Sequence, residues 1–211
     1  DTVITTASAG ERGGDDTPAS VDLEGNRNLI DAARTAGVRR FIFVSALLAR
    51  ADHPVPVPRA KALTEAALQG SGLTYTIVAA NAIADVMFPL VVGYPLGVGK
   101  PVTLVGEGRR RHTFIAARDV AAFATAAVDH PSALNRRIEI GGPDALSWRD
   151  VLAAYERTLG RPIPVQWIPP GEMLPDLPPA PRLTPLVSGL LAALETFDTP
   201  LDMTEVSRTF G

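Results

Sequence analysis

The side chains best placed for chemistry follow two predicted strands. Residues 41–44 form a continuous β-prone run that ends at Ser45, and residues 75–78 form another that leads to Asn81. Because the carboxyl ends of parallel strands share one edge of a sheet, the Ser45 hydroxyl and the Asn81 amide are expected to lie where ligands bind. Taken alone, Ser45 can equally satisfy backbone groups at the end of its strand.

Two basic side chains are candidates for moving a proton. Lys61 lies in the first turns of a helix predicted for residues 59–69, and His53 lies in the proline-rich loop before it. An ammonium in the first turns of a helix is unfavourable beside the positive end of the helix dipole. A lysine in that position is therefore typically solvated. A single histidine in a loop is typically structural or exposed, although its ordinary pKa suits it to acid–base catalysis.

Other kinds of site are disfavoured by residue types and spacing. The chain has no cysteine, so thiolate zinc sites, disulfides and cysteine nucleophiles are excluded. Its three histidines lack the spacing of zinc ligands, and no Gly-x-Ser-x-Gly sequence occurs. Residues 93–100 have the wrong glycine spacing for a phosphate loop, and Pro101 stands where such a loop needs a hydroxyl. We expect no metal.

Charge and hydropathy restrict the partners. The formal net charge is −3, and the one basic run, residues 109–111, is interpreted as a solvated turn, so no nucleic-acid partner is expected. The longest apolar stretch, residues 83–98, is interrupted by Asp85, Gly93 and Pro95 and is too short to cross a membrane. Without a charged and then apolar leader, a cytoplasmic location is expected.

Strands and helices alternate along the chain, which predicts an α/β fold with a mostly parallel sheet. Thr17 and Pro18 are expected to open a helix that runs to about Ala36. Segments 102–104 and 112–115 are interpreted as a hairpin or a paired excursion, followed by a helix that Asp119 caps. The remaining elements expected are a strand at 137–140, a helix opened by a Ser147–Asp150 capping box, a strand at 163–167 and a last helix near 186–194.

The order of these segments resembles a known family, the atypical extended short-chain dehydrogenase/reductases, and most of all their NmrA-like branch, which includes isoflavone-reductase-like enzymes. The resemblance covers most of the chain and depends on many weak motifs in order. These are the opening strand, the segments beginning at Val21, Phe41, Leu73 and Phe114, the helix with Lys61, and residues 138–147.

The resemblance implies a fold and its division. The fold is then a partial doubly wound Rossmann-like parallel sheet with a small C-terminal α/β lobe on the substrate side. Residues 1–135 are expected to form the C-terminal part of the NAD(P)-binding domain, with an excursion at about 83–111 to the substrate side. Residues 136–211 are expected to form a small cap.

Site roles follow from the same resemblance. It implies that Lys61 and Ser45 are catalytic, since the family serine polarises a carbonyl oxygen and the lysine holds the nicotinamide ribose. Val57 stands where the proton-donating tyrosine usually lies, four residues before the lysine, and valine cannot transfer a proton. Residues 79–82 are similar to the corresponding turn of isoflavone-reductase-like proteins. In those proteins the resemblance implies that the lysine itself is the general base. Lys61 is therefore the leading candidate.

The cofactor implied is NADP or NAD, with NADPH favoured by the resemblance alone. Ala7, Ser8, Ser45, Lys61 and Asn81 are the predicted cofactor-binding residues. Ala7 and Ser8 follow the opening strand, where small residues permit close approach of a ligand to the backbone. The asparagine usual after the helix-opening valine is replaced by Asp22 in this sequence.

Two functions remain open at this point. One is an NAD(P)H-dependent reductase of a small organic substrate. The other is an NmrA-like redox-sensing regulator, which binds the nucleotide without turnover and acts on a protein partner. No glycine-rich phosphate fingerprint precedes the strand at 1–8. We therefore expect further strands upstream in the native protein, and weak dinucleotide binding by the present chain alone.

Overall fold

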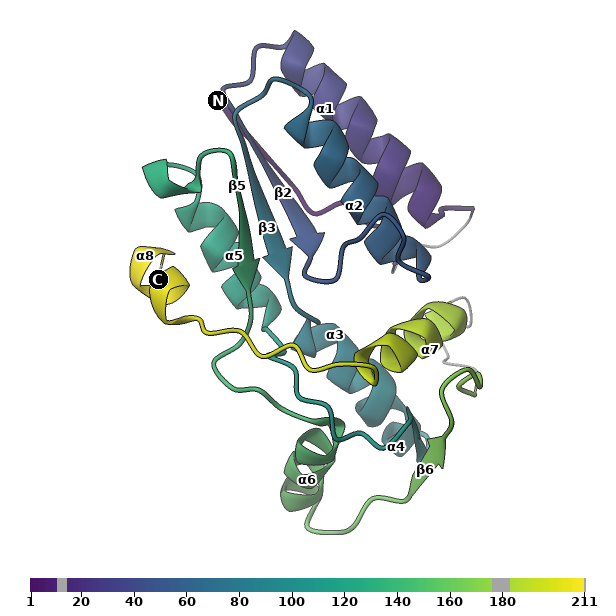
Figure 1. Ribbon diagram of the computed structural model, residues 1–211. Helices are drawn as coiled ribbons and strands as arrows, with labels where there is room; N and C mark the ends of the chain where they lie inside the picture. Colours follow the sequence, from purple (N-terminus) through teal and green to yellow (C-terminus); the bar gives the residue numbers. More distant parts are fainter. Residues whose placement is uncertain (11–14, 176–182, 211) are drawn as a thin grey trace. The chain divides into compact units, whose positions relative to one another are not determined.

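The chain folds into two compact units, which are described separately (Figure 1). The computed structural model describes residues 1–10, 15–175 and 183–210. Unit 1 consists of Asp1–Asn81, Ala117–Ile140 and Asp202–Gly211, and unit 2 consists of Ala82–Ala116 and Gly141–Leu201.

Unit 1 is built on a four-stranded parallel sheet with the order β1-β2-β3-β5. All three pairings are parallel, which confirms the predicted α/β class and its Rossmann-like sheet. The strands are β1 (Thr2–Thr5), β2 (Arg40–Ala46), β3 (Tyr75–Ala80) and β5 (Arg136–Ile140).

The sheet is covered on both faces, as its continuous apolar strands require. Phe41 and Phe43 of β2 pack with Ile30 and Leu68 from α1 (Asn26–Thr35) and α2 (Pro56–Gln69). Residues between them point the other way because side chains alternate along a strand.

The second face is covered by α5 (Ala117–Ala126), which contacts β3. Arg40, one residue before Phe41, donates to the Ala127 carbonyl at 3.1 Å. Thr76 of β3 likewise donates to the Ala133 carbonyl at 2.7 Å, in η3 (Pro131–Ala133). Helical cover on both faces is the doubly wound arrangement that was predicted.

The helix predicted after Thr17 is confirmed, but it changes from a π-helix to an α-helix along its length. It begins as a π-helix, η1 (Pro18–Gly25), with Thr17 as the N-cap, and continues as α1. Gly37, at φ +66°, lies just beyond its end, in the left-handed conformation that favours glycine. Residues 11–14, in the segment before this helix, lie outside the described residues.

The predicted hairpin is wrong. β4 (Val102–Val105) pairs in parallel with β6 (Val165–Ile168), which is about sixty residues later in the chain, and residues 112–115 form only isolated bridges. Parallel strands must be joined by a long crossover, so the partner of β4 is not the segment nearest to it in the sequence. Asp119 also lies within the first turn of α5 and is not its cap.

The boundary between the units differs from the expected one at 135/136. β5 pairs with β3, Thr76 opposite Arg136, so residues 136–140 belong to the sheet of unit 1. The chain also returns to unit 1 at its end, through α8 (Thr204–Phe210), where the Phe210 ring lies 4.9 Å from the His130 ring.

Unit 2 is organised around a buried tryptophan. Trp148 is edge-on to Phe88 and Phe114, with ring centroids 5.9 and 5.4 Å away. The capping box between Ser147 and Asp150 is confirmed at the start of its helix. The helical segments are α3 (Ala84–Phe88), η2 (Pro89–Gly93), α4 (Tyr94–Gly97), α6 (Trp148–Leu159) and α7 (Leu183–Leu194).

No helix within the described ranges has the length and apolarity needed to cross a bilayer. The longest runs of helix in unit 1 are amphipathic, with one face on the sheet.

Candidate functional site

Lys61 is buried at the C-terminal end of β2, and not solvated as a lysine in its position typically is. Its Nζ donates to the Val44 carbonyl at 3.1 Å and lies 3.7 Å from Asp22 Oδ1. The side chains of Lys61 and Asp22 are 11% and 0% exposed. The Phe43 ring, 5.2 Å away, adds a cation–π contact. Lys61 and Asp22 thus form a buried ion pair.

Asp22 links that pair to the loop after β1. Its Oδ2 accepts the Ala9 backbone N–H at 2.9 Å, and its carbonyl accepts the Thr64 hydroxyl at 2.6 Å. Its Oδ1 receives no hydrogen bond from the residues the structure describes. A buried carboxylate with an incomplete set of donors depends on its ionic partner, which is Lys61.

Asn26 completes the connection to β1. Its Oδ1 accepts the Thr5 hydroxyl at 2.9 Å, and its Nδ2 donates to the carbonyls of Ala7 and Asp22 at 3.3 and 3.1 Å. Because Asn26 is fully buried, these bonds replace those it would make with water. The end of β1 is therefore tied to the helix that carries Asp22.

The environment of Lys61 changes its acidity. Burial lowers the pKa of the Lys61 ammonium, and the nearby carboxylates of Asp22 and Glu65 oppose that change. An ammonium whose pKa is lowered gives up its proton more readily at neutral pH than an ordinary lysine. Lys61 is therefore chemically suited to move a proton.

Ser45 lies inside β2, one residue before its end, and is 3% exposed. Its hydroxyl donates a hydrogen bond to Glu65 Oε1. Glu65 Oε2 accepts from Arg137 Nε at 3.0 Å, and Arg137 also donates to the carbonyls of Ala46 and Leu47 at 3.1 Å. The structure therefore brings Ser45 beside a buried carboxylate.

Glu65 and Arg137 were missed by the sequence reasoning. The spacing of Lys61 and Glu65, four residues apart, places both on one face of a helix and was the available signal. Arg137 alternates with the buried Ile138 in β5, so it had to lie on the opposite face of that strand.

The remaining predicted residues occupy the same ends of the strands. Ala7 is exposed and Ser8 half-buried after β1, so the backbone there is open to a ligand. Asn81 is buried after β3, and its backbone N–H donates to the Ile140 carbonyl at 2.9 Å. His53 is buried, and its Nδ1 accepts the Val55 N–H at 3.0 Å, which holds the turn into α2.

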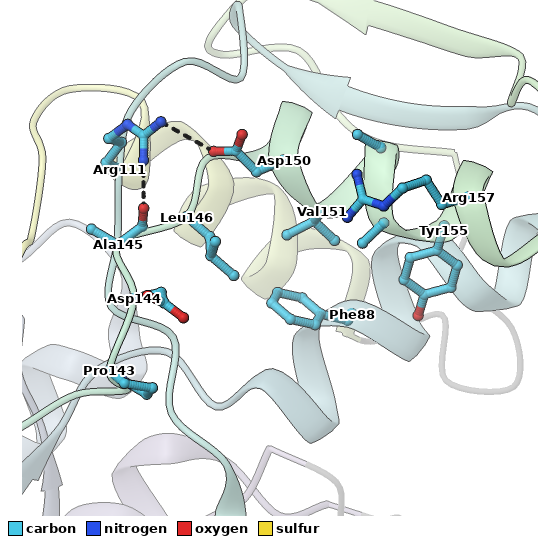
Figure 2. Close-up of a pocket in the computed structure, with 12 residues that line it drawn as sticks. Phe88, Arg111, Pro143, Asp144, Ala145, Leu146, Asp150, Val151, Tyr155 and Arg157 are labelled. Carbon is cyan, nitrogen blue, oxygen red and sulfur yellow. Dashed lines mark hydrogen bonds and ion pairs between the residues drawn. The ribbon is translucent and has the colours of Figure 1, made fainter.

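Unit 2 contains a cavity of about 710 Å³ (Figure 2). At its edge Arg111 donates to the Ala145 carbonyl at 2.6 Å and lies 3.5 Å from Asp150. Burial raises the pKa of Tyr155, so its phenol stays protonated over a wider pH range. The lining residues are Phe88, Arg111, Pro143, Asp144, Ala145, Leu146, Asp150, Val151, Ala153, Ala154, Tyr155 and Arg157.

No group of three or more potential metal-ligating side chains gathers within residues 1–10, 15–175 and 183–210. The donor set at the ends of β1 and β2 instead consists of one buried ammonium, an exposed backbone at Ala7 and a hydroxyl at Ser8. Small residues permit close approach of a ligand to the backbone, and the ammonium is the group that the resemblance places at the nicotinamide ribose of a dinucleotide.

The sequence profile that describes NAD(P)H-binding proteins matches residues 1–131. The chain belongs to the NAD(P)H-binding family. This confirms the resemblance to atypical short-chain dehydrogenase/reductases and the expected cofactor class.

Two curated relatives of this NAD(P)H-binding chain are reductases. The NAD(P)H azoreductase of Xenophilus azovorans is 33% identical over 137 residues, 64% of this chain and 46% of the relative. A phenylcoumaran benzylic ether reductase of Nicotiana tabacum is 26% identical over 180 residues, 81% of this chain and 58% of the relative. The chain spans about half the length of the curated relatives it matches.

Solved structures support the fold. The NADPH-dependent quinone oxidoreductase of Escherichia coli, solved with NADPH, superposes with a TM-score of 0.68 at 18% identity, covering 100% of this chain and 76% of that one. At that identity the likeness is one of fold.

Proposed function

We propose that the protein is an NAD(P)H-dependent reductase of a small organic substrate. The observation that carries the proposal is the buried Lys61–Asp22 pair at the C-terminal end of the sheet, in a chain of the NAD(P)H-binding family. A buried ammonium has a cost that a structural role does not explain, because an apolar residue of similar size would fill the same space.

Lys61 is proposed as the group that holds the nicotinamide ribose and moves the proton. The cofactor supplies the hydride. Val57 has no proton to give, and Lys61 has a pKa lowered by burial, so the proton is assigned to Lys61 Nζ. Ser45 is the second catalytic candidate at the same strand end.

Ala7, Ser8 and Asn81 are proposed to contact the cofactor. Ala7 has no bulky side chain and is exposed at the end of β1, which allows a ligand to approach the backbone closely. Asn26 fixes the Ala7 carbonyl and so holds this turn in place. NADPH is proposed over NADH by the resemblance to NmrA-like and isoflavone-reductase-like proteins.

The cavity of unit 2 is proposed to receive the substrate. Its volume lies in the range of small-molecule sites, and Phe88, Leu146 and Val151 give it an apolar wall. By their names, the two curated relatives described above are an azoreductase and a phenylcoumaran benzylic ether reductase. A conjugated or aromatic acceptor is the substrate class we propose.

The decisive experiment is titration of the full-length protein with NADPH and NADH, followed by nicotinamide fluorescence and melting temperature. Binding of either nucleotide supports the proposal, and no change in either signal contradicts it. Oxidation of the reduced cofactor is then followed across quinones, azo dyes, enones and carbonyl compounds. We expect Lys61→Ala to lower turnover by about 10²- to 10⁴-fold, as for loss of a general acid or base.

A second candidate is favoured by Val57. Without the usual proton donor, the protein can serve as a redox-sensing regulator that binds NAD(P)H and acts on a protein partner. Tight binding of reduced cofactor with no turnover of any compound in that panel would support the regulator.

A further inference from the structure

Glu65 joins three elements of unit 1 through a buried carboxylate. Ser45 of β2 donates its hydroxyl proton to Glu65 Oε1, and Arg137 of β5 donates to Glu65 Oε2 at 3.0 Å. Side chains alternate between the two faces of a sheet, so Ser45 lies on the same face as Phe43. Arg137 lies opposite Ile77, which packs with Phe43 on that face. Both side chains therefore point toward α2.

The hydroxyl of Ser45 has a single proton. Since that proton is directed to Glu65, Ser45 Oγ offers only lone pairs to any other group. An oxygen that accumulates negative charge needs a donor, which Ser45 cannot provide while this bond is made. Of the two catalytic candidates, Lys61 alone then has protons to donate.

Glu65 also determines where Lys61 lies. The two residues are four apart in α2, so they share one face of the helix. Arg137 anchors Glu65 through Nε and the carbonyls of Ala46 and Leu47, just beyond Ser45, through Nη2. The rotation of α2 is thereby fixed against the end of β2, where Lys61 Nζ reaches the Val44 carbonyl.

We propose that Glu65 is a positioning residue, which holds Lys61 at the end of β2 and makes Ser45 a hydrogen-bond acceptor. Lys61 is then the donor that polarises the reacting oxygen. The inference depends on the proposed function, since it takes Lys61 as the reacting group. Arg137 serves by holding Glu65.

Glu65→Gln tests the proposal, because it keeps the shape of the side chain and removes its charge. We expect kcat to fall by about 100-fold, because the reacting group is misplaced. The cofactor KM should rise by less than that, because Ala7, Ser8 and Asn81 still contact the nucleotide. The pH profile should also shift to lower pH, because the Glu65 charge raises the pKa of Lys61.

Glu139→Gln is the matched control. Glu139 also pairs with Arg137, but its side chain is 49% exposed, whereas that of Glu65 is 10% exposed. The same change of charge there should leave kcat and the pH profile near those of the wild type. If Glu65→Gln fails to fold, Arg137→Lys keeps the positive charge, loses the forked contacts and should lower kcat in the same direction.

Two results overturn the proposal. One is a Ser45→Ala variant as impaired as Lys61→Ala, because Ser45 would then be the donor. The other is a Glu65→Gln variant with the kcat and pH profile of the wild type.

A measurement without turnover separates this proposal from the proposed function. Reductive ¹³C-methylation and NMR titration give the pKa of Lys61 directly, and that pKa should be lower in Glu65→Gln than in wild type or Glu139→Gln. An unchanged pKa contradicts the role of Glu65, whereas failure of the wild type to bind NADPH contradicts the proposed function.

Discussion

Two charged clusters of the molecule differ in burial and therefore in how much they contribute to the free energy of unfolding. The Lys61–Asp22 pair of unit 1 has exposed fractions of 11% and 0%. The arginine run of unit 2 also pairs with carboxylates, but Arg109 and Glu107 are 70% and 77% exposed. Exposed pairs contribute little to stability because water and salt screen them, whereas breaking a buried pair leaves an uncompensated charge. The cluster that is conspicuous in the sequence is therefore the weaker one.

Replacement of Asp22 should have the largest effect on stability. Asp22→Ala leaves the Lys61 ammonium buried without its partner, and we expect about 3–5 kcal/mol of destabilisation. Urea denaturation followed by circular dichroism measures it. Asp31→Ala is the control, because Asp31 pairs with Arg34 at 3.5 Å on the surface, and a similar loss there would remove the distinction between buried and exposed pairs.

Asn26→Ala should follow in magnitude. The substitution leaves the buried Thr5 hydroxyl without its acceptor and removes one donor from the carbonyls of Ala7 and Asp22. An unsatisfied buried polar group costs about 1–3 kcal/mol. The same urea titration measures it. A variant as stable as wild type would show that this network makes no net contribution.

The pH dependence of stability should carry the signature of Lys61. Because its pKa is lowered in the folded state, the unfolded chain keeps the proton longer, and stability rises with pH up to about 10.4, by at most about 1.4 kcal/mol per pH unit. The charged or polar groups facing Lys61 are Asp22 from η1, Glu65 from α2 and the Val44 carbonyl from β2.

Two variants test that assignment of the pH dependence. Lys61→Met should lack the rise in unfolding free energy with pH. In Asp22→Asn the rise should begin at lower pH, because the Asp22 charge that raises the pKa of Lys61 is removed. Equal slopes in Lys61→Met and wild type would assign the rise to other groups.

The smallest effect is expected in the arginine run. Arg109→Ala should change the unfolding free energy by no more than about 0.5 kcal/mol, since an exposed pair with Glu107 is lost. Thermal denaturation at low and high salt measures it. A loss comparable to that of Asp22→Ala would contradict the comparison.

The strands of the sheet could be predicted from sequence because a strand buried on both faces is apolar throughout. Phe41–Val44 is such a run and lies in β2. Tyr75–Val78, which lies in β3, is β-prone although it contains Thr76. The partner of β4 could not be predicted. Hydrophobic periodicity indicates where a strand lies, but not which distant strand it pairs with, and β4 pairs with β6 across a long crossover.

The candidate site was only partly predictable. Lys61 was found through resemblance, since nothing local distinguishes it from a solvated lysine; its burial depends on Asp22, which is 39 positions away. Asp22 was noticed only as a departure from the usual asparagine. Glu65 had a helical spacing that signalled it, but its role depends on Arg137 in a strand that follows the whole excursion through unit 2.

The placement of the two tryptophans has a spectroscopic consequence. Trp148 is buried among Phe88 and Phe114, Trp167 lies under the Arg149 guanidinium at 4.7 Å, and both belong to unit 2. The chain has no other tryptophan. Tryptophan fluorescence therefore reports on unit 2 alone, because unit 1 contains no tryptophan. Comparing emission with circular dichroism during unfolding therefore measures whether the two units melt together or one after the other.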